Sequence, residues 1–424
     1  MAYMKGVVFL FPGQGSQFPG MCKDIYNRNS IARQVFEEAS DSIKIDMKKL
    51  CFERSENDLM KSENAQPAIL TAGYASFSVL IDEIGVRPDF MAGHSLGEIT
   101  ALTCAGGIKF SDAVKIAKQR GVFMQEAAAG GGCMTSISGL DADVIEAECK
   151  RSFMNGDIVC ISNYNSVTQT VISGHLVAVE AVENNLRNLG AEIIRLKVNA
   201  PFHSMLMQPV VKKLRAELEK YEYSNLRIPV ISSVDAKLYN GCEVIIEYLT
   251  QQVIKPVRWR ETVEYLLSNG MQLAVELSPG SILTNIIKKS NIDIQTCSYD
   301  YDSEAIRDTY IQTKRMDTYK DGASIIRKCM GTAVSTNNIN WDNDEYYRGV
   351  IVPYNRVQQM YDELEENGKE PSNKQVQEAL IMLKSVFITK RTPMEEQVKC
   401  FEKIIGKVEI DGFDIRIKED MDVL

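Results

Sequence analysis

Histidine is scarce in this sequence, with three residues in 424: His94, His175 and His203. A metal site built from three histidines would use all of them, and histidine-dependent catalysis has only these three positions. The ten cysteines include no Cys-x-x-Cys pair, and the closest two, Cys149 and Cys160, are eleven residues apart. This spacing excludes a zinc ribbon and a thioredoxin-type redox site.

Long apolar runs and a basic excess are also missing. No apolar run approaches the length of a membrane span, and the apolar stretch after Lys5 is too short for the core of a signal peptide. The 48 basic and 57 acidic side chains give a net charge of −9, which argues against a nucleic-acid partner. We therefore expect a soluble cytoplasmic protein whose cysteines are reduced and buried.

The remaining composition is that of a folded protein. Hydrophobic residues make up 45% and charged residues 25% of the chain, whose length predicts two or three domains. Residues 6–11 form an unbroken apolar run before a Pro-Gly-Gln-Gly turn, which is typical of a strand buried on both faces. Helical stretches then alternate with short apolar runs to about residue 128. This alternation predicts an α/β fold with helices covering a parallel sheet.

A second, smaller unit is predicted after the three glycines at 130–132, which provide a flexible entry. Its order is β-α-β-β-α-β, which is the ferredoxin-like split motif. The elements are a strand at 133–138, a helix at 141–151, strands near 158–163 and 168–173, a helix at 175–189 and a strand at 191–197. The parallel-sheet pattern then resumes, with a helix near 205–220 and strands near 228–233 and 273–277.

The chain beyond about residue 300 predicts further helices. Ser372 and Gln375 form a capping box before apolar residues at helical spacing. Pro393 is placed at the start of another helix, and Gly406 is placed to end it. The Asp411-Gly412 pair between short apolar runs predicts a small terminal hairpin.

A candidate nucleophile lies in Gly93-His94-Ser95-Leu96-Gly97, between an apolar run and a helical stretch. A Gly-x-Ser-x-Gly turn between strand and helix exposes the serine oxygen on a sharp elbow. The start of the helix beside it favours developing negative charge. This context makes a chance match to the pentapeptide the weaker interpretation.

The serine needs a base within hydrogen-bond reach, and each histidine is a candidate. His94 adjoins the serine, so its side chain should point away from the serine oxygen. His175 lies at a strand–helix junction of the smaller unit, where a surface or capping histidine is the simpler interpretation. His203 lies where the chain returns to the main sheet, and its location favours it as the base.

Six motifs occur in an order similar to that of malonyl-CoA:acyl carrier protein transacylases. They are Phe11-Pro12-Gly13-Gln14-Gly15-Ser16-Gln17, Gln66-Pro67-Ala68, Gly93-His94-Ser95-Leu96-Gly97-Glu98, Gln119-Arg120-Gly121, Ala200-Pro201-Phe202-His203 and Glu276-Leu277-Ser278-Pro279-Gly280. The resemblance covers roughly residues 5–300. It implies an α/β-hydrolase-like large subdomain (1–129 and 199–300) with an inserted ferredoxin-like small subdomain (130–198). Residues 301–424 are then a mainly helical extension of open role.

The resemblance also implies roles for single residues. Ser95 resembles the family's nucleophile and His203 its base, oriented by the backbone carbonyl of Gln252 rather than by an acidic residue. The backbone N–H groups of Gln14 and Leu96 resemble the oxyanion hole. The implied substrate-binding positions are Gln66, Arg120, Met124, Asn163 and Phe202, with a strand-end structural role as the alternative for Asn163.

Arg120 resembles the family's clamp for the malonyl carboxylate, because a guanidinium can grip a carboxylate through two parallel hydrogen bonds. Without the resemblance, a surface arginine beside Lys115 and Lys118 would be the simpler interpretation. Phe202 and Leu96 resemble malonyl-selective members. A bulky ring would crowd an α-methyl group, although a methyl-sized difference is worth only about 1–3 kcal/mol.

The implied reaction moves a malonyl group from malonyl-CoA to Ser95 and then to the phosphopantetheine thiol of an acyl carrier protein, without metal or redox cofactor. The extension favours a discrete acyltransferase that serves a polyketide synthase in trans. A housekeeping fatty-acid malonyltransferase, an acyl hydrolase that clears stalled chains, and an inactive docking subunit are the alternatives. Acidic carrier proteins require a local basic patch, for which the candidates, otherwise solvated surface charges, are Arg258, Arg260, Lys288 and Lys289.

Overall fold

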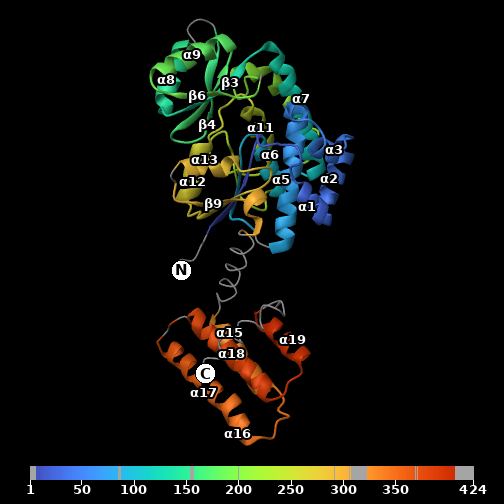
Figure 1. Ribbon diagram of the computed structural model, residues 1–424, viewed down its shortest axis with the longest axis vertical. Helices are drawn as coiled ribbons and strands as arrows, with labels where there is room; N and C mark the ends of the chain where they lie inside the picture. Colours follow the sequence, from blue (N-terminus) through green and yellow to red (C-terminus); the bar gives the residue numbers. More distant parts are fainter. Residues whose placement is uncertain are drawn as a thin grey trace. The chain divides into compact units, whose positions relative to one another are not determined.

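The computed structural model describes residues 6–84, 87–152, 157–198, 200–290, 292–304, 306, 322–367, 369 and 371–405. Its internal contacts divide the chain into two compact units, Met1–Asp308 (unit 1) and Thr309–Leu424 (unit 2). The division falls after residue 308, whereas the motifs suggest an extension that begins at 301. Each unit is described by itself (Figure 1).

Unit 1 contains a five-stranded parallel sheet in the order β7-β2-β1-β8-β9. The strands are β1 (Val7–Phe11), β2 (Phe90–Gly93), β7 (Val230–Ile231), β8 (Leu273–Glu276) and β9 (Gln295–Ser298). The apolar run predicted as a buried strand is β1, which pairs with β2 on one side and β8 on the other. Because β1 is the central strand, the turn that follows it lies at the middle of the sheet's carboxyl edge. This is where α/β proteins bind their ligands.

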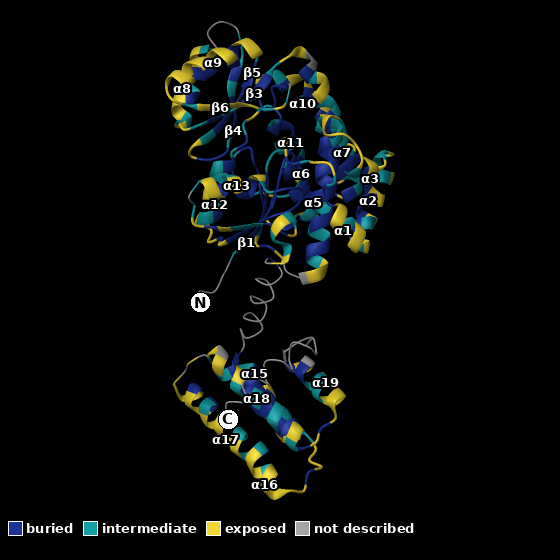
Figure 2. Cartoon of the chain, in the orientation of Figure 1, coloured by how far each residue is buried: buried dark blue, intermediate teal, exposed yellow. Residues whose placement is uncertain are grey.

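Helices cover both faces of this sheet (Figures 1 and 2). Val8 and Leu10 of β1 pack in one cluster with residues of α12 and α13, whereas the ring of Phe9 meets that of Phe77 in α5 at 6.3 Å. The helices of unit 1 outside the smaller subdomain include α1 (Lys23–Arg28), α2 (Ser30–Ile43), α3 (Met47–Phe52), α4 (Glu56–Met60), α5 (Ser62–Ile84), α6 (Leu96–Cys104), α7 (Phe110–Ala127), η1 (Ala128–Gly130), η3 (Met205–Met207), α10 (Gln208–Leu218), η4 (Cys242–Val244), α11 (Ile245–Gln252), α12 (Trp259–Ser268) and α13 (Ile282–Lys289).

The smaller subdomain is an antiparallel sheet in the order β4-β5-β3-β6, with two helices. This order is that of a ferredoxin-like motif. The elements are β3 (Cys133–Ser138), α8 (Ala142–Ser152), β4 (Val159–Tyr164), β5 (Gln169–Gly174), α9 (Leu176–Asn188) and β6 (Glu192–Arg195). Each differs from its predicted range by one or two residues at most at either end.

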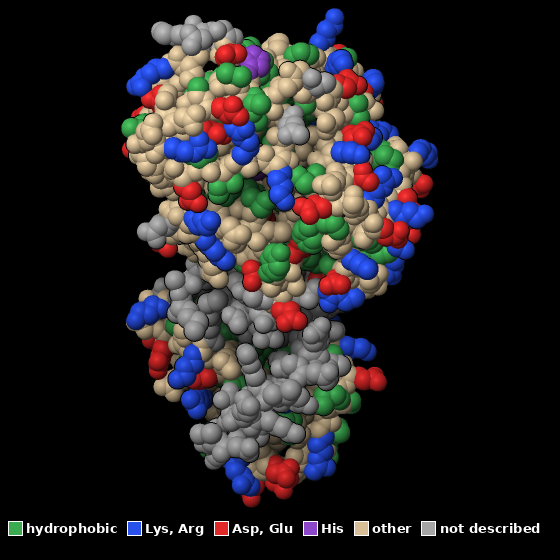
Figure 3. All heavy atoms as spheres, turned by 45° about the horizontal axis from the view of Figure 1, so that its top comes forward, with side chains coloured by type: hydrophobic (Ala, Val, Ile, Leu, Met, Phe, Trp, Pro, Cys, Tyr) green, Lys and Arg blue, Asp and Glu red, His purple; other side chains and the backbone are tan. Residues whose placement is uncertain are grey.

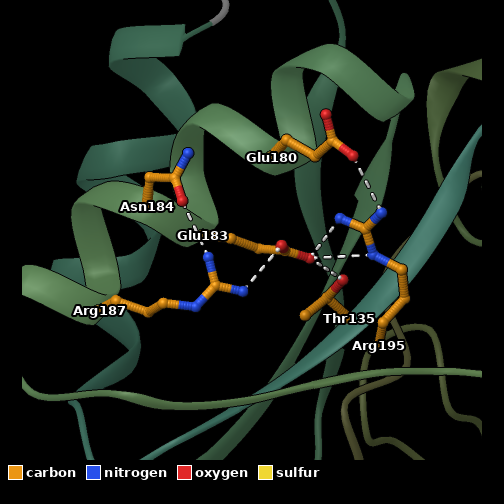
Figure 4. A network of polar contacts seen from close by, with 6 residues as sticks. All are labelled: Thr135, Glu180, Glu183, Asn184, Arg187 and Arg195. Atoms are coloured by element: carbon orange, nitrogen blue, oxygen red, sulfur yellow. Dashed lines mark hydrogen bonds and ion pairs between the residues drawn. The ribbon is translucent and has the colours of Figure 1, made fainter.

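A buried carboxylate fastens α9 to this sheet (Figure 4). Glu183 points from α9 toward the strands and accepts hydrogen bonds from Thr135 of β3 and Arg195 of β6, both at 2.7 Å. Arg187 reaches its other oxygen at 3.2 Å. Burial raises the pKa of Glu183, but the hydrogen bonds from Thr135 and Arg195 outweigh burial, so the pKa is lowered overall. The network holds β6, an edge strand that pairs with β3 alone.

Unit 2 is helical where it is described. Its elements are α15 (Gly322–Ser335), α16 (Asn343–Tyr346), the π-helical turn η5 (Tyr347–Ile351), α17 (Val352–Glu366), α18 (Asn373–Thr389) and α19 (Met394–Ile405). They share a core centred on the fully buried Leu383, Val386 and Phe387 of α18. The predicted capping box of Ser372 and Gln375 is confirmed at the start of α18. The predicted hairpin at 411–412 and the helix stop at 406 lie outside the described residues.

No helix in the described part of the chain is long and apolar enough to span a membrane. On the face of the molecule that Figure 3 shows, basic and acidic side chains are interspersed rather than gathered by sign.

Candidate active site

The turn between β2 and α6 is a sharp elbow that carries Ser95. The serine has φ 53° and ψ −108°, outside the usual regions for a residue with a side chain. A Cβ added to Gly93 would lie 1.9 Å from the carbonyl carbon of Gly97, and one added to Gly97 would lie 1.9 Å from the carbonyl oxygen of Phe11. The two glycines are therefore required for the backbone to pass, and the strand–turn–helix context predicted for the motif is present.

His203 stands opposite the serine. Its Nε2 lies 2.8 Å from Ser95 Oγ, and its Nδ1 lies 2.8 Å from the backbone oxygen of Gln252. Because a carbonyl oxygen only accepts, Nδ1 carries the proton and Nε2 is free to accept the serine proton. Burial and the nearby charge of Arg120 lower the pKa of His203 to about 3. The imidazole is thus neutral at neutral pH, in the form that a general base needs.

The other two histidines do not reach the serine hydroxyl. His94 turns its Nε2 toward Asn165 Oδ1 at 3.1 Å, and its ring meets that of Trp259 edge-on. His175 lies before α9, where its Nδ1 accepts from the backbone N–H of Ile158 at 3.1 Å. Location and the family resemblance both favour His203 as the base, and of the three histidines it is the one whose ring nitrogen lies within hydrogen-bond reach of Ser95 Oγ.

Arg120 of α7 is not a surface arginine: 1% of it is exposed. Its Nη1 donates to Gln66 Oε1 at 2.8 Å, and its Nη2 donates to Gln252 Oε1 at 2.9 Å and to Ser95 Oγ at 3.2 Å. Its Nε is buried without a hydrogen-bond partner among the described residues. Burial lowers the pKa of Arg120 to about 10, with Glu98 acting in the opposite direction. The guanidinium therefore stays charged at neutral pH, next to the nucleophile.

A cavity of about 780 Å³ in unit 1 is lined on one side by the turns that follow β1 and β2 and on another by strands of the small subdomain. Ser95, His203 and Arg120 line its floor, together with the predicted substrate positions Met124, Asn163 and Phe202. Predicted Gln66 does not line the cavity but is buried behind Arg120, where its Nε2 lies 3.5 Å from Met124 Sδ. The volume lies within the usual range for small-molecule sites.

The small subdomain supplies the polar wall of this cavity. Ser136, Ser138, Asn163 and Gln169 from its strands line it. Asn163 is 4% exposed, and its Oδ1 accepts from Ser162 Oγ at 2.7 Å. Asn163 thus lies one residue before the end of β4 and also borders the cavity, so its position is compatible with either interpretation.

The two residues whose backbone amides the resemblance assigns to an oxyanion hole lie near the elbow: Gln14 lines the cavity with Ser95, and Leu96 follows Ser95 in the chain. Leu96 is the first residue of α6, and Gln14 follows the close approach of Gly13 to the elbow. Neither backbone N–H has a hydrogen-bond acceptor among the described residues. Their role as an oxyanion hole therefore stays a prediction, in which each donor would typically be worth about 10²–10³ in rate.

Of the four predicted basic docking positions, Lys289 alone lines the cavity. Arg258 forms an ion pair with Glu261 at 2.6 Å, and Arg260 forms one with Glu264 at 2.8 Å. Residues of α13 also line the cavity, and the N–H groups of Leu283 and Thr284 in its first turn donate to the buried carboxylate of Glu276. Lys197, which the sequence motifs did not mark, also lines the cavity.

Glu98 is part of the Gly93–Glu98 motif, but the motif does not assign it a role. It is fully buried in α6. A lone carboxylate in the otherwise uncharged stretch Leu96–Cys104 is the signal that could have marked it, because ionisable side chains are almost never buried without partners.

The comparisons with known proteins agree with this geometry. Residues 8–314 match the family model described as "Acyl transferase domain". A malonyl CoA-acyl carrier protein transacylase from Bacillus subtilis is 34% identical over 402 residues, which cover 94% of this chain and 100% of the relative. The transacylase of that name from Escherichia coli K12 is 39% identical over 297 residues, which cover 70% of this chain and 96% of the relative.

Solved structures give the same result. The malonyl CoA-acyl carrier protein transacylase from Coxiella burnetii is similar with a TM-score of 0.68 and 36% identity, over 70% of this chain and 95% of that one. A malonyl transacylase in complex with its type II polyketide synthase acyl-carrier protein is similar with a TM-score of 0.67 and 38% identity, over 69% of this chain and 96% of that one. The chain therefore belongs to the malonyl-CoA:acyl carrier protein transacylase family of acyltransferases.

Proposed function

We propose that this protein transfers the malonyl group of malonyl-CoA to the phosphopantetheine thiol of an acyl carrier protein through a covalent ester on Ser95. The observation that carries the proposal is the position of Ser95 Oγ, which lies 2.8 Å from His203 Nε2 and 3.2 Å from Arg120 Nη2. A base and a buried cation thus meet at one hydroxyl. The names of the relatives support malonyl-CoA and carrier protein as the two substrates.

In the first half-reaction, His203 Nε2 takes the proton of Ser95 as Oγ attacks the thioester carbonyl. The amides of Gln14 and Leu96 stabilise the negative charge on the carbonyl oxygen. The carbon–sulfur bond breaks, and the imidazolium returns its proton to the sulfur, so that coenzyme A leaves as the free thiol. In the second half-reaction the carrier thiol gives its proton to His203, its sulfur attacks the ester, and Ser95 regains the proton.

Arg120 is proposed to bind the free carboxylate of the malonyl group. Nε and Nη2 lie on one edge of the guanidinium, and Nε is the buried donor that lacks a partner. A carboxylate on this edge would satisfy Nε and replace Ser95 as the acceptor of Nη2, which releases the hydroxyl for attack. Phe202 lines the same cavity, and its bulky ring would crowd an α-methyl group. No metal or redox cofactor takes part in these steps.

We further propose that the carrier belongs to a polyketide synthase that this enzyme serves in trans. The Bacillus subtilis relative matches 94% of the chain, so the similarity extends into unit 2, whereas the Escherichia coli relative matches 70%. A structural neighbour is bound to the carrier protein of such a synthase. A housekeeping enzyme of fatty-acid synthesis would have the same active site, and the choice of carrier distinguishes the two.

The test is a competition between two holo carrier proteins, one from a fatty-acid synthase and one from a polyketide synthase. The full-length enzyme is incubated with malonyl-CoA and an equimolar mixture, and intact masses are followed with time. Faster loading of the polyketide carrier supports the proposal, and faster loading of the fatty-acid carrier replaces it with the housekeeping function. Release of free malonate with neither carrier loaded indicates the acyl hydrolase instead.

A further inference from the structure

Glu98 is a buried carboxylate that the proposed mechanism does not use. It lies in the first turn of α6, three residues after Ser95. Its Oε1 accepts from the hydroxyl of Tyr239 at 2.5 Å. Its Oε2 accepts from Ser233 Oγ and from Gln252 Nε2, both at 2.5 Å, and from the backbone N–H of Ser233 at 3.2 Å. Four donors therefore converge on a carboxylate that water does not reach.

The contact with Gln252 determines which way that side chain points. An amide presents an oxygen on one side and an NH₂ group on the other, and it can fit a site in either orientation. A carboxylate that accepts hydrogen bonds selects the orientation with NH₂ toward itself. Gln252 Nε2 accordingly faces Glu98, and Gln252 Oε1 faces Arg120 Nη2 at 2.9 Å. Were the amide turned over, its NH₂ would oppose the Arg120 donors.

Gln252 is also the residue that joins Arg120 to the catalytic pair. Its backbone oxygen accepts from His203 Nδ1 at 2.8 Å, and its Nε2 donates to the backbone oxygen of Ser95 at 3.0 Å. One residue thus touches the base, the nucleophile's backbone and the guanidinium. Fixing its amide fixes the guanidinium relative to the serine.

Burial raises the pKa of Glu98, whereas the hydrogen bonds from Ser233, Tyr239 and Gln252 favour its charged form. Arg120 is buried, and Glu98 is the charged group that favours its ionised form. A buried cation without a counter-charge is costly. The carboxylate lies on the opposite side of Gln252 from the guanidinium, so it balances the charge without occupying the position where a substrate carboxylate would bind.

We propose that Glu98 is a positioning residue that, through the side-chain amide of Gln252, holds Arg120 in the orientation that selects acyl groups carrying a carboxylate. The inference rests on the proposed malonyl transfer. It assigns acyl selectivity to a residue that touches neither the substrate nor the reacting atoms.

The test compares acylation of Ser95 by malonyl-CoA and by acetyl-CoA in the full-length protein, as the ratio of the two kcat/KM values. Glu98→Gln keeps the size of the side chain but lets the Gln252 amide turn. We expect the ratio to fall about 10- to 100-fold, mostly through malonyl-CoA. Tyr239→Phe is the matched control, because it removes a donor from the other oxygen of Glu98 and leaves Gln252 in place; its ratio should stay within about threefold of wild type.

The dependence on Arg120 is tested by combining substitutions. In an Arg120→Met background, Glu98→Gln should change the ratio by less than about threefold, because the group it positions is absent. Should Glu98→Gln fail to fold, Gln252→Met serves in its place. That substitution keeps the backbone oxygen that contacts His203 and removes the amide, and it should lower the ratio to a similar extent.

The outcomes distinguish failure of the role proposed for Glu98 from failure of the proposed malonyl transfer. Equal losses for malonyl-CoA and acetyl-CoA in Glu98→Gln, or an unchanged ratio in Gln252→Met, would overturn the inference and leave malonyl transfer standing. A fall of the ratio in the Arg120→Met background as large as in wild type would overturn it too. If the wild-type protein forms no malonyl ester, the proposed function is wrong and the inference falls with it.

Discussion

Replacement of Arg120 by methionine should convert the enzyme from a malonyl-selective to an unselective acyltransferase. Methionine has a similar length and is apolar, so it fills the buried space but offers no donor. Arg120 lies 3.2 Å from the nucleophile and has an unsatisfied Nε, so we expect two charge-assisted hydrogen bonds to the malonyl carboxylate. An acetyl group makes neither of them.

The magnitude follows from those two bonds. A hydrogen bond to a charged group contributes about 1.5–3 kcal/mol, so two give about 3–6 kcal/mol. Since about 1.4 kcal/mol is tenfold in rate, Arg120→Met should lower kcat/KM for malonyl-CoA by about 10²–10⁴. The value for acetyl-CoA should change by less than about tenfold. Arg120→Lys keeps a charge without the fork and should fall between these limits.

A second effect comes from the charge itself. Arg120 is one of the causes that lower the pKa of His203. Without it the pKa of His203 should rise. As the solution is acidified, the rate of Ser95 acetylation should therefore begin to fall at a higher pH in Arg120→Met than in the wild type.

The assay is rapid mixing with acyl-CoA, quenching and measurement of intact protein mass, carried out for both acyl groups at several pH values. Equal decreases for malonyl-CoA and acetyl-CoA would refute the assignment of Arg120 as the carboxylate clamp. An unchanged preference for malonyl-CoA would refute it as well.

Three further predictions concern the base, the small subdomain and the elbow. Because the pKa of His203 is about 3 rather than 6.5, the acylation rate should show no inflection between about pH 5 and 8; an inflection near 6.5 in stopped-flow measurements would contradict the geometry. Glu183→Gln should lower the free energy of unfolding in urea by about 2 kcal/mol, a figure discounted because its arginine partners are more than a third exposed. Since the pKa of Glu183 is lowered below 4.5, its contribution is present above that value, and the difference from wild type should shrink as the pH falls through the folded-state pKa; an increasing difference would be the wrong sign. Gly97→Ala should prevent soluble expression, because its Cβ would lie 1.9 Å from a backbone oxygen, whereas Gly331→Ala in α15 meets no atom within 4 Å and should express as wild type; equal solubility of the two would refute the steric argument.

The parallel sheet and the ferredoxin-like unit could be predicted from the sequence because local patterns specify them. The buried run of β1 and the β-α-β-β-α-β order each depend on the periodicity of a short segment. The helix predicted near 205–220 begins later than expected, because Met205–Met207 forms a 3₁₀ turn and α10 starts at Gln208. The boundaries of short β7 and β6 were predicted too long, since pairing with neighbouring strands ends them.

The candidate site was predictable where a residue stands in a motif and unpredictable where its partners come from distant segments. Ser95 is marked by its elbow glycines. The contact of Glu98 with Gln252 joins residues 154 positions apart, and nothing in the local sequence of either residue encodes it. Arg258 and Arg260 were candidate docking residues by charge alone, and their ion pairs with neighbouring glutamates became visible only in the fold.

The central claim is that the malonyl group is carried on Ser95 between coenzyme A and the carrier protein. The most direct measurement is tandem mass spectrometry of the enzyme quenched after reaction with malonyl-CoA, before and after addition of holo carrier protein. The account predicts one malonyl group on the peptide that contains Ser95, absent in Ser95→Ala, stable in water on the timescale of turnover and lost when the carrier gains it. A malonyl group on another residue would contradict the claim, and so would loading of the carrier protein by the Ser95→Ala variant.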